Sequence, residues 1–191
     1  MPEYKTKHSL YTHRSYKPGG RFWQRRLWPL ARWAIFNSPF GHMPVKRFLL
    51  RFFGASVGNG LVMGTHVNIK YPWNLVIGKD VWIGERTWFD SLSKIRLGDN
   101  VCISQGAYLL NGNHNYASES FDLIVKDITL EEGVWIGAGC IVCPGITAHS
   151  HAVLSVGSVA TSNLDAYSVY QGNPARKIRS RTIQPSVQSL P

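Results

Sequence analysis

A six-residue period runs through the middle and the end of the chain, and it constrains the fold more than any other feature. From Val57 onward, an apolar residue recurs at every sixth position and is followed by glycine or by another small or polar residue. These positions are residues 57, 63, 69, 77, 83, 89, 97, 103, 109, 130, 136, 142, 148, 154 and 160. A short fixed period indicates that the chain repeats one turn of structure, so we expect three hexads to form one coil.

The other positions of the hexad predict the shape of the coil. The fifth position holds a small or β-branched residue, at Val81, Thr87, Val101, Ala107, Val134, Cys140, Ala152 and Ser158. One apolar and one small inward residue per hexad suit three flat faces that meet at tight corners, with glycine, asparagine or aspartate where the backbone needs unusual dihedral angles. The chain is therefore predicted to be an all-β protein, a parallel β-helix. Two residues are added after Ile69 and again after Phe89, so the first coils should be longer.

The sixth position of the hexad should point outward, and in four places it is aromatic: Trp82, Trp88, Tyr108 and Trp135. Outward aromatic side chains on a solenoid wall predict that another surface covers them. The N-terminal helices and neighbouring subunits are the two candidates.

The chain of 191 residues divides into four predicted parts within one domain. Residues 1–20 form a polar arm, and residues 21–55 form a helical cap whose first helix is expected to be split by Pro29. Residues 56–165 form the β-helix, with a long excursion at residues 111–129. Residues 166–191 form a basic tail.

The net charge of +10 is concentrated in the first quarter of the chain and in the tail. Such a protein favours an anionic partner, but no nucleic-acid-binding module accompanies the charge, so no nucleic acid is expected. Arginines and tryptophans alternate in the helical cap, which indicates an end cap for the coils, with peripheral contact to a membrane surface as the alternative. The sequence shows neither a signal peptide nor a spanning segment, so a cytoplasmic location is the default expectation.

The motifs along the chain resemble those of a known family. The hexads, the loop GNHNYASESFDLI, the run VWIGAGCIVCPGIT and the ending GNPARKI occur in the order found in hexapeptide-repeat O-acetyltransferases, nearest to the colanic-acid-type enzymes and close to the maltose, galactoside and nodulation acetyltransferases. The resemblance covers about residues 45–181. It implies a left-handed β-helix, a homotrimer with active sites between adjacent subunits, and transfer of acetyl from acetyl-CoA to a sugar hydroxyl of an exopolysaccharide or lipid-linked oligosaccharide precursor.

The longest interruption of the repeat, between Leu109 and Leu130, holds His114, in a context that matches the catalytic histidine of the family. A histidine can take the proton of the attacking hydroxyl and return it to the leaving thiol, so no covalent intermediate is needed. Asp90 and Asp122 are candidates for orienting His114 or the acceptor sugar. Ser91 stands where the family often has asparagine. We treat Ser91, like Asp122, as a candidate contact to the acceptor sugar.

The resemblance also assigns the coenzyme groove. It implies that Trp135 lies against the pantetheine arm, with Ala138, Val156 and Thr161 along the slot. Many relatives have lysine where this chain has Ser162, so the phosphate contact is expected to move to Arg176 or Lys177.

Two other functions remain open on the same scaffold. One is a noncatalytic β-helix used for assembly. The other is a metalloenzyme of the γ-carbonic-anhydrase type, which needs three zinc histidines, whereas the excursion offers only His114. Cys140 and Cys143 have no second pair, and His149 and His151 are expected to be ordinary turn residues, so no metal is expected.

Overall fold

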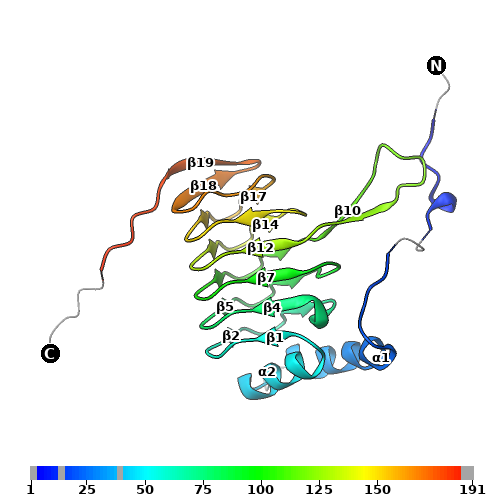
Figure 1. Cartoon of the computed structure of the whole chain (residues 1–191), viewed down its shortest axis with the longest axis horizontal. Coiled ribbons are helices and arrows are strands. Elements are labelled where there is room, and N and C mark those ends of the chain that lie inside the picture. Colours follow the sequence, from blue (N-terminus) through cyan, green and yellow to red (C-terminus); the bar gives the residue numbers. More distant parts are fainter. Residues whose placement is uncertain (1–3, 13–15, 38–40, 186–191) are drawn as a thin grey trace.

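The chain folds into a parallel β-solenoid of about six turns, in a computed structural model that describes residues 4–12, 16–37 and 41–185 (Figure 1). Most strands contain two or three residues, and each pairs in parallel with the strand one turn further on. Since each turn contributes one strand to each of three sheets, the turns stack into a column with three flat faces. The predicted all-β parallel helix is therefore confirmed.

Each sheet collects equivalent strands of successive turns. The first contains β1 (Ser56–Val57), β4 (Leu75–Ile77), β7 (Ile95–Leu97), β12 (Ile128–Leu130) and β15 (Thr147–Ala148). The second contains β2 (Val62–Met63), β5 (Trp82–Ile83), β8 (Cys102–Ile103), β13 (Trp135–Ile136), β16 (Val153–Leu154), β18 (Ser168–Gly172) and β19 (Ala175–Ser180). The third contains β3 (Asn68–Ile69), β6 (Trp88–Phe89), β9 (Tyr108–Leu109), β14 (Ile141–Val142) and β17 (Val159–Ala160). A separate antiparallel pair, β10 (Gly112–His114) and β11 (Leu123–Val125), leaves the column between β9 and β12.

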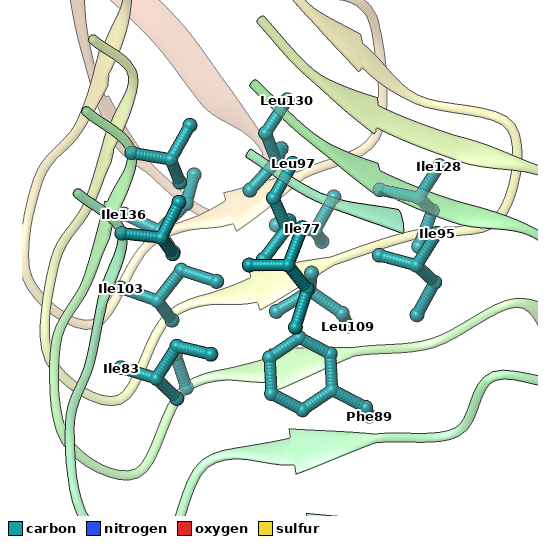
Figure 2. Close-up of a cluster of buried hydrophobic side chains, with 14 of the residues drawn as sticks. Ile77, Ile83, Phe89, Ile95, Leu97, Ile103, Leu109, Ile128, Leu130 and Ile136 are labelled. Atoms are coloured by element: carbon teal, nitrogen blue, oxygen red, sulfur yellow. The ribbon is translucent and has the colours of Figure 1, made fainter. Parts of the chain in front are cut away.

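Apolar side chains from equivalent positions stack in columns inside the solenoid (Figure 2). Ile77, Leu97 and Leu130 lie in register on β4, β7 and β12. The matching column of the second sheet contains Ile83, Ile103 and Ile136. All the predicted apolar positions of the hexads, and all the small fifth positions, are buried. Because burial of one large aliphatic side chain contributes about 1.5–3 kcal/mol, these columns are the main source of stability.

The corners of the coil depend on a left-handed backbone at the fourth position of the hexad. Asp80, Asn100 and Gly133 occupy equivalent corners with φ of 54°, 57° and 66°. These are the residue types that tolerate this region best, as the sequence predicted. His66 and Arg86 adopt the same conformation with φ of 56° each, so the regular stacking of the turns imposes it on less suitable residues as well.

Two helices close the open end of the first turn (Figure 1). They are α1 (Phe22–Ala31), which continues into a π-helical segment, η3 (Arg32–Phe36), and α2 (Met43–Phe52). The expectation that Pro29 splits the first helix is wrong. Proline removes only its own N–H donor, and the backbone N–H of Arg32 still donates to the carbonyl of Trp28, so the helix continues and its next turn widens.

Hydrogen bonds fasten the cap to the first turn of the solenoid. The indole N–H of Trp28 donates to the carbonyl of Ile69 at 2.8 Å. The buried ammonium of Lys46 donates to the carbonyl of Gly64 at 2.9 Å, and burial lowers the pKa of this lysine. These bonds satisfy backbone carbonyl groups at the end of the column, where no further turn can pair with them.

The described parts of the predicted arm and tail contain regular structure that the sequence did not indicate. Residues 168–180, which the sequence assigned to the tail, form the β18–β19 hairpin, and β18 pairs in parallel with β16. The hairpin lacks the hexad period, so the sequence pattern could not reveal it. At the other end, a short 3₁₀ helix, η1 (His8–Leu10), lies in the arm, and a second one, η4 (Pro72–Asn74), occupies the insertion after Ile69. Among the described residues, none of the helices combines the length and the apolar character needed to span a bilayer.

Candidate active site

The excursion that carries His114 is an antiparallel hairpin whose base is held by hydrogen bonds. In β10 and β11, Gly112 pairs with Val125 and His114 pairs with Leu123. At the base, the buried amide of Asn111 donates to the carbonyl of Lys126 at 2.8 Å. The carboxylate of Asp127 accepts hydrogen bonds from Ser93, from the Lys94 backbone N–H and from Arg96. The solenoid therefore controls the direction in which the hairpin projects.

A backbone carbonyl orients the ring of His114. The Nδ1 atom of His114 lies 2.8 Å from the carbonyl oxygen of Phe121, and the Phe121 ring stacks on the imidazole with centroids 4.4 Å apart and planes at 8°. A carbonyl oxygen can only accept, so Nδ1 carries the hydrogen, and Nε2 of the neutral ring presents its lone pair. The sequence offered only side-chain carboxylates as the orienting partner. The structure places this backbone group there instead.

His114 lines a cleft of about 550 Å³ at the corner between the third and first sheets. The lining residues are Tyr11, Tyr16, Pro18, Lys70, Tyr71, Asp90, Leu92, Gly112, His114 and Leu123. Hydroxyl, ammonium and aromatic groups thus surround a half-buried imidazole, which is a suitable environment for a polar molecule with apolar faces.

The N-terminal arm forms one wall of this cleft. Its Tyr16 hydroxyl donates to the carbonyl of Leu92 at 2.8 Å, and burial, followed by the nearby Tyr71 and Asp90, holds the pKa of that hydroxyl far above its ordinary value. Further along, the backbone N–H of Lys7 donates to the carbonyl of Glu119 at 2.8 Å, and their side chains form an ion pair. The arm therefore runs from the solenoid wall to the tip of the excursion, a placement that no sequence signal indicated.

Asp90 lies in the same cleft but its carboxylate is occupied. One oxygen accepts from the ammonium of Lys70 at 3.1 Å, and the other accepts from the backbone N–H of Gly112 at 3.2 Å. Since Gly112 begins the strand that ends in His114, Asp90 acts on the position of β10. Lys70, half exposed in the cleft, is a functional candidate that the sequence reasoning missed.

The structure does not bring Ser91 and Asp122 to the cleft. Ser91 is fully buried, and its hydroxyl oxygen accepts from the backbone N–H of Tyr71 at 2.8 Å. Asp122 lies in the excursion, where its carboxylate accepts from the hydroxyl of Ser120. Ser91 thus serves the backbone of the neighbouring turn and Asp122 a side chain of the excursion, and neither residue belongs to the lining of the His114 cleft.

A second cleft, of about 650 Å³, lies over the second sheet. Trp135, Ala138 and Val156, three of the residues predicted for a coenzyme groove, all line it, and the indole N–H of Trp135 donates to the hydroxyl of Ser104 at 3.0 Å. The other residues proposed for this groove, Thr161, Ser162, Arg176 and Lys177, are exposed outside its lining.

The basic residues of this second cleft come from the end of β19 and beyond it. Arg179 and Arg181 line it, and the guanidinium of Arg181 donates to the carbonyls of Gly133 and His151. Lys177 instead lies 3.6 Å from the carboxylate of Asp165. A register shift in the β18–β19 pair decides which basic side chains face the cleft, and such a shift leaves no mark in the sequence.

The two clefts share no lining residue and lie on different sides of the column. The excursion projects from one side, and the strands of the second sheet lie on another (Figure 1). A single chain therefore does not bring His114 to Trp135.

The histidines considered for a metal make local contacts. His149 lies 3.0 Å from a carboxylate oxygen of Glu131, and His151 stacks on Tyr167 with centroids 4.8 Å apart. Within residues 4–12, 16–37 and 41–185, no group of three or more histidine, cysteine or acidic side chains is arranged to hold a metal ion.

The sequence and the fold were compared with those of known proteins. No protein-family model matches the chain. The chain is 34% identical over 168 residues to the protein named colanic acid biosynthesis acetyltransferase WcaF of Escherichia coli K12, which covers 85% of this chain and 90% of that protein. The fold of this chain is similar to that of a maltose O-acetyltransferase from Clostridium difficile. The two are 25% identical with a TM-score of 0.75, over 86% of this chain and 87% of the other.

A second solved structure has the same fold. It is a hexapeptide-repeat acetyltransferase from Vibrio cholerae in complex with acetyl coenzyme A, at 21% identity and a TM-score of 0.75, over 84% of this chain and 88% of that one. The solenoid is thus the left-handed parallel β-helix that the resemblance implied. From the identity to WcaF over most of both proteins, the chain belongs to the hexapeptide-repeat acetyltransferases.

Proposed function

We propose that this protein transfers the acetyl group of acetyl-CoA to a hydroxyl of a sugar, in an exopolysaccharide or lipid-linked oligosaccharide precursor. The observation that carries the proposal is the hydrogen bond from Nδ1 of His114 to the carbonyl of Phe121, because it leaves Nε2 as a proton acceptor in a polar cleft. The names of the relatives, which include maltose and galactoside O-acetyltransferases, support a sugar as the acceptor.

The reaction needs one base and no covalent intermediate. As the sugar oxygen attacks the thioester carbonyl carbon, Nε2 of His114 takes the hydroxyl proton. The tetrahedral intermediate then collapses, the carbon–sulfur bond breaks, and the imidazolium returns the proton to the departing sulfur of coenzyme A. Stacking on Phe121 keeps the imidazole plane constant through both proton transfers.

Acetyl-CoA would occupy the second cleft, against Trp135, Ala138 and Val156. The cationic side chain of Arg179 suits the phosphates better than that of Lys177, which is engaged by Asp165. Because the two clefts lie on different sides of one chain, we propose that His114 of one copy meets the Trp135 cleft of another, in a homotrimer.

Mixed oligomers test this arrangement directly. His114→Ala removes the base, and Ala138→Trp fills the second cleft, so each variant alone should be inactive with acetyl-CoA and a panel of sugar acceptors. Co-expressed, the two should regain about a quarter of the wild-type activity, since random mixing pairs an intact His114 with an intact neighbouring cleft at that frequency.

Three results would contradict the proposal. Mixed oligomers without activity would show that both residues act within one chain. Wild-type turnover by His114→Ala in a folded protein would remove the histidine from the mechanism, and absence of acetyl-CoA binding to a folded wild-type trimer would favour a scaffold.

A further inference from the structure

The helical cap presents an apolar face that the solenoid does not use. Phe22, Leu30 and Trp33 are 67%, 66% and 73% exposed, and Phe48 and Phe52 of α2 are exposed as well. Phe22, Arg26 and Pro29 are spaced so that they share one side of α1, opposite the buried Gln24 and Trp28. Together these side chains on the helices of the cap exceed the apolar surface that a folded protein normally leaves in water.

This face cannot turn inward, because the opposite sides of the same helices are already bound. Trp28 and Lys46 are buried and donate to carbonyls of the first turn, and Arg51 donates to the carbonyl of Val57 at 2.6 Å. Trp28 also packs edge-on against Phe36 and Phe53. The outward face is therefore held in place and available to a partner.

The charge around the face has one sign. Residues 21–52, which include both helices, contain seven lysines and arginines and no aspartate or glutamate. Arg21, Arg25 and Arg26 are exposed on the first helix or just before it, and the guanidinium of Arg26 lies 5.2 Å from the centroid of the Phe22 ring. Arginine and aromatic side chains are thus interleaved on the same surface.

We propose that the outward face of α1, η3 and α2 binds the surface of an anionic lipid bilayer. Aromatic and leucine side chains can enter the boundary between headgroups and acyl chains while the arginines contact lipid phosphates. A second copy of this cap would bring like charges together. A nucleic acid would match the charge but would leave Leu30 and the phenylalanines exposed to water.

The position of the cap fits this role. The two helices lie at one end of the solenoid, and the β18–β19 hairpin lies at the other (Figure 1). Binding through the cap leaves the excursion and the Trp135 cleft accessible, because both belong to later turns. The proposal stands apart from the acetyl transfer, since it uses no residue of either cleft.

Co-sedimentation with vesicles tests the proposal on the full chain. We expect binding to vesicles of phosphatidylcholine mixed with phosphatidylglycerol, binding at least ~10-fold weaker to phosphatidylcholine alone, and partial release by high salt. Phe22→Ser with Trp33→Ser should lower binding about 10-fold or more. The matched control is Ile178→Ser with Ile183→Ser, two apolar side chains away from the cap that are 52% and 51% exposed.

A second pair of variants tests the charge. Arg26→Glu should weaken binding to the anionic vesicles, whereas Lys79→Glu, the same change of charge on a turn of the solenoid, should leave it nearly unchanged. Circular dichroism and acetyl-CoA titration establish that each variant is folded. Equal loss in both variants, equal binding to neutral vesicles, or retention on duplex DNA with no binding to vesicles would overturn the proposal.

Discussion

The backbone carbonyl of Phe121 and the Nδ1 atom of His114 lie 2.8 Å apart, with the two rings stacked. Phe121 adopts a left-handed backbone with φ of 53°, which is unfavourable for a bulky residue. The hairpin of β10 and β11 maintains this conformation, and the result is a carbonyl and a ring that act together on one imidazole. This contact determines which nitrogen of His114 is able to accept a proton.

The first prediction concerns that nitrogen. When the His114 imidazole is neutral, its single N–H hydrogen should reside on Nδ1, because only a donor satisfies the Phe121 carbonyl. Nitrogen-15 NMR of histidine-labelled protein, with His114→Gln to assign the signal, can identify the tautomer. A signal for hydrogen on Nε2 would contradict the proposed base.

Asp90 should contribute to turnover by positioning β10, through the hydrogen bond that its carboxylate accepts from the Gly112 backbone N–H. Asp90→Asn keeps an oxygen that can accept from the Gly112 backbone N–H, so its turnover should fall less than 10-fold. Asp90→Ala removes both acceptors and should lower turnover further, by about 10- to 100-fold, as β10 loses its anchor. Steady-state kinetics of both variants measure the difference. An equal and severe loss of turnover in Asp90→Asn and Asp90→Ala would indicate that the negative charge of Asp90 takes part in the chemistry.

Trp135→Ala should weaken acetyl-CoA binding by about 10-fold, because the indole ring forms one wall of the second cleft. Trp82→Ala is the matched control, since Trp82 also points outward from the second sheet but does not line this cleft. Calorimetric titration compares the two. Similar weakening in both variants would mean that the coenzyme lies elsewhere or that the sheet has been disturbed.

Removal of residues 1–17 should raise the KM for the acceptor while leaving acetyl-CoA affinity unchanged. The deletion takes away Tyr11 and Tyr16, which line the His114 cleft, and touches nothing in the second cleft. Tyr16→Phe, which loses only the hydrogen bond to the Leu92 carbonyl, should have a smaller effect. An unchanged KM would show that the arm is not part of the acceptor site.

Asp127 should contribute a pH-dependent part of the stability. Burial raises the pKa of Asp127, but hydrogen bonds from Ser93, Arg96 and the Lys94 backbone, with the charge of Arg96, outweigh burial and lower it overall. A lowered pKa stabilises the fold above the unfolded value of about 3.9, and this contribution disappears as the pH falls through the lower folded value.

Asp127→Asn should therefore destabilise the protein at neutral pH by on the order of 1 kcal/mol, because the half-exposed carboxylate is screened by solvent. The difference from wild type should shrink as the pH falls below about 4. Urea unfolding at several pH values measures it, with Asp165→Asn, a more exposed carboxylate, as the control. A difference that is constant with pH would rule out the ionised carboxylate as its source.

The hexad positions show where sequence reasoning was strong. Val57, Leu97 and Leu130 are buried because each hexad specifies one inward residue, and the same local rule repeats in every turn. Trp135, Ala138 and Val156, which the resemblance grouped, line one cleft. Thr161 and Ser162 lie on the last regular turn, and the groove does not extend to them.

The hairpin and the arm show where such reasoning stopped. Lys70 and Asp90 are twenty residues apart, and only the stacking of two turns makes them an ion pair. Arg179 replaces Lys177 in the second cleft because of a register shift between two strands. Neither relationship follows from a repeat or from the chemistry of a single residue.

The sequence by itself determined the solenoid and its buried columns, because a six-residue period is a local property that each hexad carries, and it marked His114 as the candidate base only through the interruption of that period and the resemblance of its loop. Only the tertiary structure decided that the carbonyl of Phe121 orients that histidine and that the N-terminal arm forms one wall of its cleft. It also placed the histidine and the Trp135 cleft on different sides of the chain. The physical reason is that every residue has a backbone carbonyl, so a contact to one depends on how distant segments pack and leaves no pattern in the amino-acid sequence.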